Sequence, residues 1–297
     1  MSVVIPTHNR PDLVRRALAS VVSQTYQGPI ETIIVHDKEP RDSTLESDDP
    51  LRPVRAIQNN RTPGLAGARN AGLAVTRGEL IASLDDDDFW IDRKVDAQVS
   101  ALCADLELLV VATGVVLHTV DGKVWQRQAV GPLVTRAELL RARIADLHSS
   151  NLMMRRRAFD IAGPYDEELL GVEDWEWLLR VSKHHPIRVV QEPLIHVFRD
   201  TPLWRPERWQ RIADAHEQVL ARHPDVEHDR DGAAYFYAKL AFAHAAGGNR
   251  RYACKLAVRA LRKRAANPWA IVAILVAALR VPVKWVQDGA NRFGRSI

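Results

Sequence analysis

Residues 80–90, LIASLDDDDFW, join a short apolar run to four consecutive carboxylates and two aromatic side chains. A buried carboxylate without a partner costs several kcal/mol, so these acids are expected at the mouth of a strand, in water or on a cation. Ligand sites in alternating strand–helix folds lie at the carboxyl ends of strands, which favours a metal site over a solvated acidic turn. Oxygen ligands of this kind suit Mg²⁺ or Mn²⁺.

The sequence around this stretch predicts an α/β fold. Apolar, β-branched runs predict strands at residues 2–5, 30–35, 54–57 and 79–84. A helix is expected from Pro11 onward, and the small residues of 64–74 predict another. This strand–helix alternation predicts a mainly parallel central sheet with right-handed crossovers, flanked by helices.

The pattern becomes purely helical after about residue 201, so we expect one domain over residues 1–200 and a helical region over 201–297. Apolar residues near the Gly247-Gly248 turn have the spacing of a tetratricopeptide-like helix pair. Such a pair is expected to pack on the rest of the chain or on a partner.

The end of the chain is strongly basic. Residues 250–297 contain eleven lysines and arginines against one acid, a net charge of +10, so the other 249 residues carry −6. The apolar run 269–279 is too short to span a membrane. It predicts either a buried helix or an interfacial anchor, and with the basic surroundings residues 268–297 could bind an anionic membrane surface. No stacking module accompanies the charge, and nucleic acid is not an expected partner.

Composition and cysteine usage indicate an ordinary globular protein of a reducing compartment. Hydrophobic residues make up 46% and charged residues 26% of the chain, which excludes a disordered protein. The two cysteines are far apart, so no disulfide framework is expected. The first residues lack the pattern of a signal peptide. We therefore expect a cytoplasmic protein, with its tail peripheral to the inner face of the plasma membrane.

Four segments together resemble family 2 glycosyltransferases. They are VVIPTHNRP (3–11), ARNAG (68–72), GELIASLDDDDFW (78–90) and GVEDWEWLLR (171–180). They occur in the family's order over about the first 200 residues. The resemblance implies a GT-A fold, which is Rossmann-like, here with an all-α C-terminal extension. It also implies a nucleotide-sugar donor, a divalent cation and inversion at the anomeric carbon.

The resemblance also implies roles on the donor side. Asp87 ends the Asp85-Asp86-Asp87 triplet, a DXD motif, and matches the family's direct metal ligand. Asp85 or Asp86 would reach the ribose or a metal-bound water, and Asp85 could share the metal. Asp88 is expected to be structural. Some relatives use a late histidine as a further metal ligand, so His196 is a candidate, with a purely structural histidine as the alternative.

The nucleoside end is expected at the mouths of the first two strands. Pro6, Thr7 and Asn9 belong to a turn that resembles the family's base-contacting turn. Asp37 matches an acid that accepts a hydrogen bond from the base, although His36 stands where the family usually has a first acid. Arg69 matches an arginine near the base and diphosphate, with a surface helix residue as the alternative.

On the acceptor side, a base must remove the proton of the attacking hydroxyl. Asp174 matches the family's catalytic base, and helix N-terminal acids favoured by the helix dipole are the alternative reading. Glu173 is expected to orient the base or bind the acceptor. Trp90 and Trp175 could stack on a sugar, although core packing is the better interpretation for a single tryptophan, and the role of His148 is open.

These observations predict a metal-dependent inverting glycosyltransferase. Its donor is a nucleotide-sugar, with a UDP-sugar favoured, and its acceptor is a glycan or a lipid-linked molecule in cell-envelope or polysaccharide biosynthesis. Two other classes remain. A nucleotidyltransferase of related fold usually opens with a glycine-rich phosphate loop, which the first strand here lacks. A non-catalytic interaction protein acting through the helical tail would not need Asp87 and Asp174.

Overall fold

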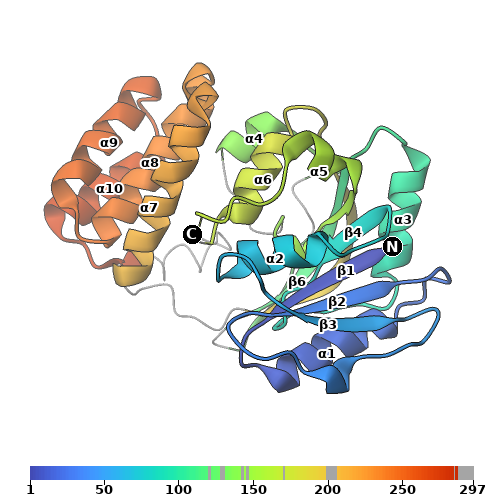
Figure 1. The fold of residues 1–297 in the computed structure, drawn as a ribbon. Coiled ribbons are helices and arrows are strands. Elements are labelled where there is room, and N and C mark those ends of the chain that lie inside the picture. Colours follow the sequence, from blue (N-terminus) through green and yellow to red (C-terminus); the bar gives the residue numbers. More distant parts are fainter. Residues whose placement is uncertain are drawn as a thin grey trace. The chain divides into compact units, whose positions relative to one another are not determined.

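The computed structural model describes residues 1–119, 122–127, 131–141, 144, 147–169, 171–198, 206–283 and 285–286. The chain divides into two compact units (Figure 1). One comprises Met1–Arg136 and Ile144–Asp200, and the other comprises Ala137–Arg143 and Thr201–Ile297. The first unit is a mixed α/β structure and the second is helical.

A central sheet organises the first unit. Its strand order within the described residues is β3-β2-β1-β4-β9-β6-β10-β5, with β7 paired to β6 and β8 paired to β10. The strands are β1 (Ser2–Thr7), β2 (Glu31–His36), β3 (Val54–Gln58), β4 (Leu80–Ser83), β5 (Phe89–Trp90), β6 (Val110–His118), β7 (Val124–Arg127), β8 (Leu133–Val134), β9 (Met153–Arg155) and β10 (Ile187–Phe198).

The sheet is parallel in one half and mixed in the other. β1 pairs in parallel with β2 and β4, and β2 pairs in parallel with β3, as the sequence predicts. β9 runs antiparallel to β4 and β6. The Ser149–Asn151 turn that precedes β9 meets the end of β4, because the Asp85 N–H donates to Ser150 Oγ at 3.0 Å. β9 therefore starts at the carboxyl edge of β4 and runs back along it.

Helices cover both faces of the parallel half. In the first unit they are α1 (Pro11–Val22), α2 (Leu65–Leu73), α3 (Lys94–Ala104), α5 (Arg157–Ala162) and α6 (Glu173–Val181), whereas α4 (Arg136–Arg141) belongs, apart from its first residue, to the second unit. Alternate side chains of a strand point to opposite faces, so Val3 and Ile5 of β1 pack in one cluster with α1. Val4 packs with Ala68 of α2 in another cluster, and Figure 1 shows α1 and α2 on opposite faces.

A glycine brings α2 unusually close to the sheet. A Cβ atom at Gly72 would lie 2.4 Å from a methyl group of Val4 on β1, closer than packed atoms allow. Gly64, which precedes α2, has a φ of 126°, a conformation that glycine adopts without a steric penalty. The small residues of this helix thus let its backbone approach the end of β1.

The second unit is built from α7 (Pro206–Arg222), α8 (Arg230–Ala246), α9 (Arg250–Lys263) and α10 (Pro268–Leu279). The central α8 packs against α7, α9 and α10. Asn267 caps α10 by accepting the N–H groups of Trp269 and Ala270, and it donates to Ala234 O on α8 at 3.1 Å. Within the described residues, none of the helices combines the length and the apolar character that crossing a membrane would require.

Candidate active site

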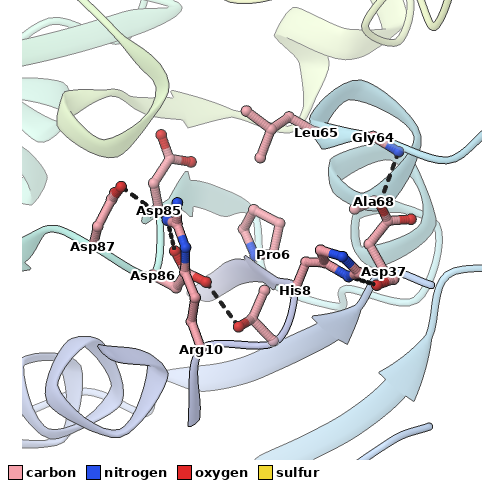
Figure 2. A pocket seen from close by; sticks show the side chains of 11 residues that line it. Pro6, His8, Arg10, Asp37, Gly64, Leu65, Ala68, Asp85, Asp86 and Asp87 are labelled. Atoms are coloured by element: carbon pink, nitrogen blue, oxygen red, sulfur yellow. Dashed lines mark hydrogen bonds and ion pairs between the residues drawn. The ribbon is translucent and has the colours of Figure 1, made fainter. Parts of the chain in front are cut away.

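A pocket of about 340 Å³ opens at the carboxyl edge of the parallel strands (Figure 2). Its walls come from the end of β1 and the turn after it, from the residue after β2, from the start of α2 and from the acids after β4. The lining residues are Pro6, Thr7, His8, Arg10, Asp37, Gly64, Leu65, Ala68, Asp85, Asp86 and Asp87. Parallel strands thus bring together segments as far apart in the sequence as Pro6 and Asp87, as expected for a ligand site of this fold class.

The turn after β1 holds two of the four acids. Thr7 Oγ1 donates to Asp86 Oδ2 at 2.8 Å, and Arg10 donates to Asp86 at 2.9 Å and to Asp87 at 3.0 Å (Figure 2). Asp86 is buried, with both of its oxygens hydrogen-bonded to the protein. Burial and the neighbouring charges of Asp85 and Asp86 raise the pKa of Asp87, and Arg10 offsets this in part. A cation beside Asp87 would relieve that repulsion.

Asp85 lies in a different environment. Arg69 donates to its Oδ1 at 2.6 Å, and Ser149 donates to its Oδ2 at 3.3 Å. Burial opposes ionisation of Asp85, but the charge and hydrogen bond of Arg69 outweigh it and lower the pKa of the carboxyl group. Asp85 is therefore an anion with a fixed orientation.

Asp85, Asp88 and His148 form a group that could hold a metal ion. One potential ligand atom from each lies within 4.8 Å of the others. Burial, with the charge of Asp85, raises the pKa of Asp88 well above its usual range, and a bound cation would reverse this. Two carboxylates and an imidazole suit Mn²⁺, so the residues fit a divalent cation.

Asp85 is common to two sets of candidate metal ligands: the pair Asp85 and Asp87 expected from the sequence, and the group Asp85, Asp88 and His148 found in the structure. Asp87, the expected direct ligand, lines the pocket at the end of β1 and is not in the group with His148. Asp88 also has a structural bond, because its Oδ1 accepts the Phe198 N–H at 3.1 Å. His196 lies outside this group, since it is hydrogen-bonded to His118 at 2.8 Å and stacked on Phe89 at 4.4 Å. Its role as a metal ligand stays a prediction.

The two acids expected on the acceptor side, Glu173 and Asp174, lie in the first turn of α6. Glu173 Oε1 accepts a hydrogen bond from Arg69 at 2.7 Å, and Asp174 Oδ1 accepts the Trp175 N–H at 2.7 Å. Both carboxylates are buried, in the first turn of a helix where the dipole favours anions. Arg69 thus contacts the acid after β4 and the acid at the start of α6 at the same time.

Asp37 lines the end of the pocket that is remote from Asp85, Asp86 and Asp87 (Figure 2). One of its carboxylate oxygens accepts a hydrogen bond from Asn59 at 2.8 Å. The other accepts the Gly64 N–H at 3.0 Å (Figure 2). His36 does not line the pocket; it organises the loop that follows, with Glu39 at 3.0 Å from Nδ1 and the Asp42 N–H donating to Nε2 at 3.2 Å. The histidine that replaces an acid of the family pattern thus has a local structural partner.

Of the other residues expected to bind the nucleotide-sugar, some line the pocket and some lie outside it. Pro6 and Thr7 line the pocket. Asn9 is exposed, has a φ of 54°, and donates its backbone N–H to Glu39 at 2.7 Å. Arg69 is not among the lining residues, although its neighbour Ala68 is.

The tryptophans expected at the acceptor are buried in this structure. Trp90 and Trp175 are each 2% exposed, and Trp90 Nε1 donates to Ser150 O at 2.9 Å. The Nζ atom of Lys94 lies 4.0 Å from the centre of the Trp90 ring. No ring face of Trp90 or Trp175 is therefore presented at the surface, and their acceptor roles stay predictions.

Several residues of the site were missed by sequence reasoning. Arg10 and His8 line the pocket, and Ser149 and Ser150 hold Asp85. Arg10 could have been found from its place directly after the first strand, where pocket residues are expected. Nothing local in the sequence connects Ser149 and Ser150 with the acids after β4, because that contact depends on the antiparallel return of β9.

Comparison with known proteins agrees with this geometry. The family model described as glycosyl transferase family 2 matches residues 2–161. The chain is 37% identical over 101 residues to the UDP-Glc:alpha-D-GlcNAc-diphosphoundecaprenol beta-1,3-glucosyltransferase WfaP of Escherichia coli. That alignment covers 33% of this chain and 39% of the relative, so the chain spans about two fifths of the relative's length.

Solved structures of similar fold include two transferases. S. aureus TarS 1-349 in complex with UDP has a TM-score of 0.56 and 18% identity, with 99% of this chain and 91% of that chain covered. The mannosyltransferase PcManGT from Pyrobaculum calidifontis, in complex with GDP-Man and Mn²⁺, has a TM-score of 0.56 and 17% identity, with 94% and 86% covered. At these identities the likeness concerns the fold.

Proposed function

Because the chain belongs to glycosyl transferase family 2 and is therefore a glycosyltransferase, we propose that it transfers a sugar with inversion from a UDP-sugar in a metal-dependent reaction. The acceptor we propose is a lipid-linked glycan of cell-envelope polysaccharide synthesis. The named E. coli relative, which uses UDP-Glc and a diphosphoundecaprenol-linked sugar, supports both choices.

The observation that carries the metal-dependent donor site is the concentration of acids at one pocket. Asp85, Asp86 and Asp87 line this pocket, and Arg10 lines the same pocket. Burial and the like charges of Asp85 and Asp86 raise the pKa of Asp87, and a divalent cation would relieve this repulsion while a diphosphate supplied further oxygen ligands to the cation. When bound, the cation would supply Lewis-acid stabilisation to the departing nucleoside diphosphate.

The chain's own residues supply binding, orientation and proton transfer. In this proposal Asp37, Pro6 and Thr7 contact the nucleoside, with Asn9 shaping the turn behind them. Asp85 and Asp87 hold the cation. Asp174 accepts the proton of the acceptor hydroxyl, since a carboxylate within hydrogen-bond reach is sufficient for this step.

Donor binding is the first test. We expect UDP to bind in the presence of MnCl₂ by isothermal titration calorimetry, and Asp87→Asn to weaken that binding by about tenfold or more because a charged oxygen ligand is lost. Asp160→Asn, which neutralises an exposed acid on α5, is the matched control and should bind UDP like the wild type. If UDP, GDP and TDP all fail to bind with Mn²⁺ present, the donor-site assignment is wrong.

The acceptor proposal extends to the membrane surface. Ile271, Leu275 and Leu279 lie on successive turns of α10 and are exposed. Trp285 is also exposed, and residues 250–297 carry a net charge of +10. Lys284 and residues 287–297 of the predicted anchor lie outside the described residues. We propose that this face docks on an anionic lipid surface, where a lipid-linked acceptor would reside.

A further inference from the structure

Arg69 joins the two sides of the site. It lies near the middle of α2, is 3% exposed, and donates through Nη2 to Asp85 at 2.6 Å and through Nη1 to Glu173 at 2.7 Å. Asp85 follows β4 on the donor side, and Glu173 begins α6 beside Asp174. A single guanidinium therefore connects three elements that meet only through the tertiary fold.

This geometry differs from that of a phosphate-binding arginine. Arg69 does not line the donor pocket, and both of its terminal nitrogens are already bonded to carboxylates. Its Nε atom is buried and has no hydrogen-bond partner among the described residues. The two short charge-assisted bonds thus hold the guanidinium between Asp85 and Glu173, outside the lining of the pocket.

The arrangement is not one that stability alone explains. Buried ion-pair triads are often no more stabilising than apolar residues of the same volume, because desolvation offsets the attraction. Glu173 Oε2 and the Tyr165 hydroxyl are also buried without a hydrogen-bond partner in the described structure, and the Arg69 guanidinium lies 6.0 Å from the centre of the Tyr165 ring. Polar atoms left in this state cost stability, and such clusters are characteristic of functional sites.

We propose that Arg69 is a positioning residue that fixes the distance between the donor-side acid Asp85 and the start of α6, which carries Asp174. This inference rests on the proposed glycosyl transfer. In a one-step displacement the base and the leaving group act on opposite faces of the sugar. A misplacement of about 1 Å between them can lower the rate by about 100-fold. Arg69 sets that separation without touching the substrate.

The decisive variant is Arg69→Lys, which keeps the positive charge but cannot bond two carboxylates with a rigid planar fork. We expect the Kd of UDP with Mn²⁺ to stay within about threefold of the wild-type value, while UDP release from UDP-glucose falls by about tenfold or more. Hydrogen exchange should rise in the first turn of α6. Glu173→Gln, which keeps the side chain's shape, should give the same pattern and replaces Arg69→Lys if that variant does not fold.

Arg156→Lys is the matched control. Arg156 contacts the segment before the N-terminal end of β4, where it donates to Gly78 O at 2.8 Å and to Thr76 O at 2.9 Å. This substitution should leave exchange in α6 and the UDP-glucose reaction unchanged. Weakened UDP binding in Arg69→Lys with unchanged exchange in α6 would overturn the positioning role and make Arg69 a donor ligand. Failure of the wild type to bind any nucleoside diphosphate would reject the proposed function, while the exchange measurement would still decide whether Arg69 holds α6.

Discussion

The four aspartates after β4 are chemically identical, but their surroundings differ. Arg69 lowers the pKa of Asp85 despite burial, whereas burial and neighbouring acids raise the pKa of Asp87 and of Asp88. Asp86 is held by Thr7 and Arg10. The run thus contains one firmly ionised acid, one acid bonded by both oxygens, and two acids that a cation would stabilise.

In the proposed mechanism, the chemistry on the acceptor side depends on Asp174. Asp174→Asn keeps the shape of the side chain but cannot accept a proton, so we expect UDP binding with Mn²⁺ to persist while transfer falls by about 10²–10⁴-fold. Transfer is measured as UDP release from UDP-glucose with a synthetic GlcNAc-diphospho-lipid. Retained turnover would remove Asp174 as the base, and Asp160→Asn, at an exposed position of α5, serves again as the control.

At the level of elements, α2 is what brings Arg69 into the site. Gly72 lets the helix approach Val4 on β1, and this close packing allows Arg69, one turn earlier, to reach acids from two other elements. Within the first turn of α6, the Trp175 N–H donates to Asp174 Oδ1. In the proposed arrangement, the spacing of the active site is therefore a property of helix packing on the sheet.

The α8–α10 contact contains a partly buried lysine whose pKa is lowered. Lys239 Nζ on α8 lies 3.8 Å from the centre of the Trp269 ring on α10, and burial lowers the pKa of Lys239 to about 8. Between about pH 8 and the ordinary value of 10.5 the unfolded chain binds more protons than the folded chain, so this group makes stability rise with pH in that window. At neutral pH it costs stability.

Lys239→Met should therefore raise the free energy of unfolding near pH 7 by about 1–3 kcal/mol, with a smaller gain above about pH 10. Urea unfolding of the full chain, followed by tryptophan fluorescence, measures this change. Lys255→Met removes an exposed lysine from α9 and should have little effect at either pH. A variant that is less stable than the wild type at neutral pH would show that the contact with Trp269 outweighs the burial cost.

For the whole molecule, charge and exposed apolar surface predict where it works. Replacing Ile271, Leu275 and Leu279 with serine should lower partitioning onto phosphatidylglycerol-containing vesicles by about tenfold or more, because the exposed face of α10 loses its apolar area. Added salt should weaken wild-type binding, and pure phosphatidylcholine vesicles should bind poorly.

The control for that experiment changes exposed apolar residues of the α/β unit. Leu51→Ser and Leu106→Ser remove leucines that are 52% and 67% exposed, without touching α10. Vesicle sedimentation of the full chain gives the bound fraction for each variant. Unchanged partitioning of the α10 variant would refute the docking face, while the UDP-binding and turnover measurements would remain valid tests of the enzyme.

The order of strands and helices in the α/β unit followed from local patterns. The strands expected near residues 2–5, 30–35 and 54–57 are present as β1, β2 and β3, and the acids do follow β4. The pairing beyond β4 was different, because β9 runs antiparallel to its neighbours. Strand direction there depends on where the preceding turn lies in space, which apolar periodicity does not encode.

By itself the sequence determined three features of this protein: an alternating α/β pattern, four acids at the end of an apolar strand, and a basic helical tail. These are local properties, set by side-chain chemistry and by periodicity along the chain. Only the tertiary structure decided that Asp85 pairs with Arg69, that Asp86 is held by Thr7 and Arg10, and that Arg69 reaches Glu173. Such partnerships form between distant segments, so packing of helices against the sheet selects them.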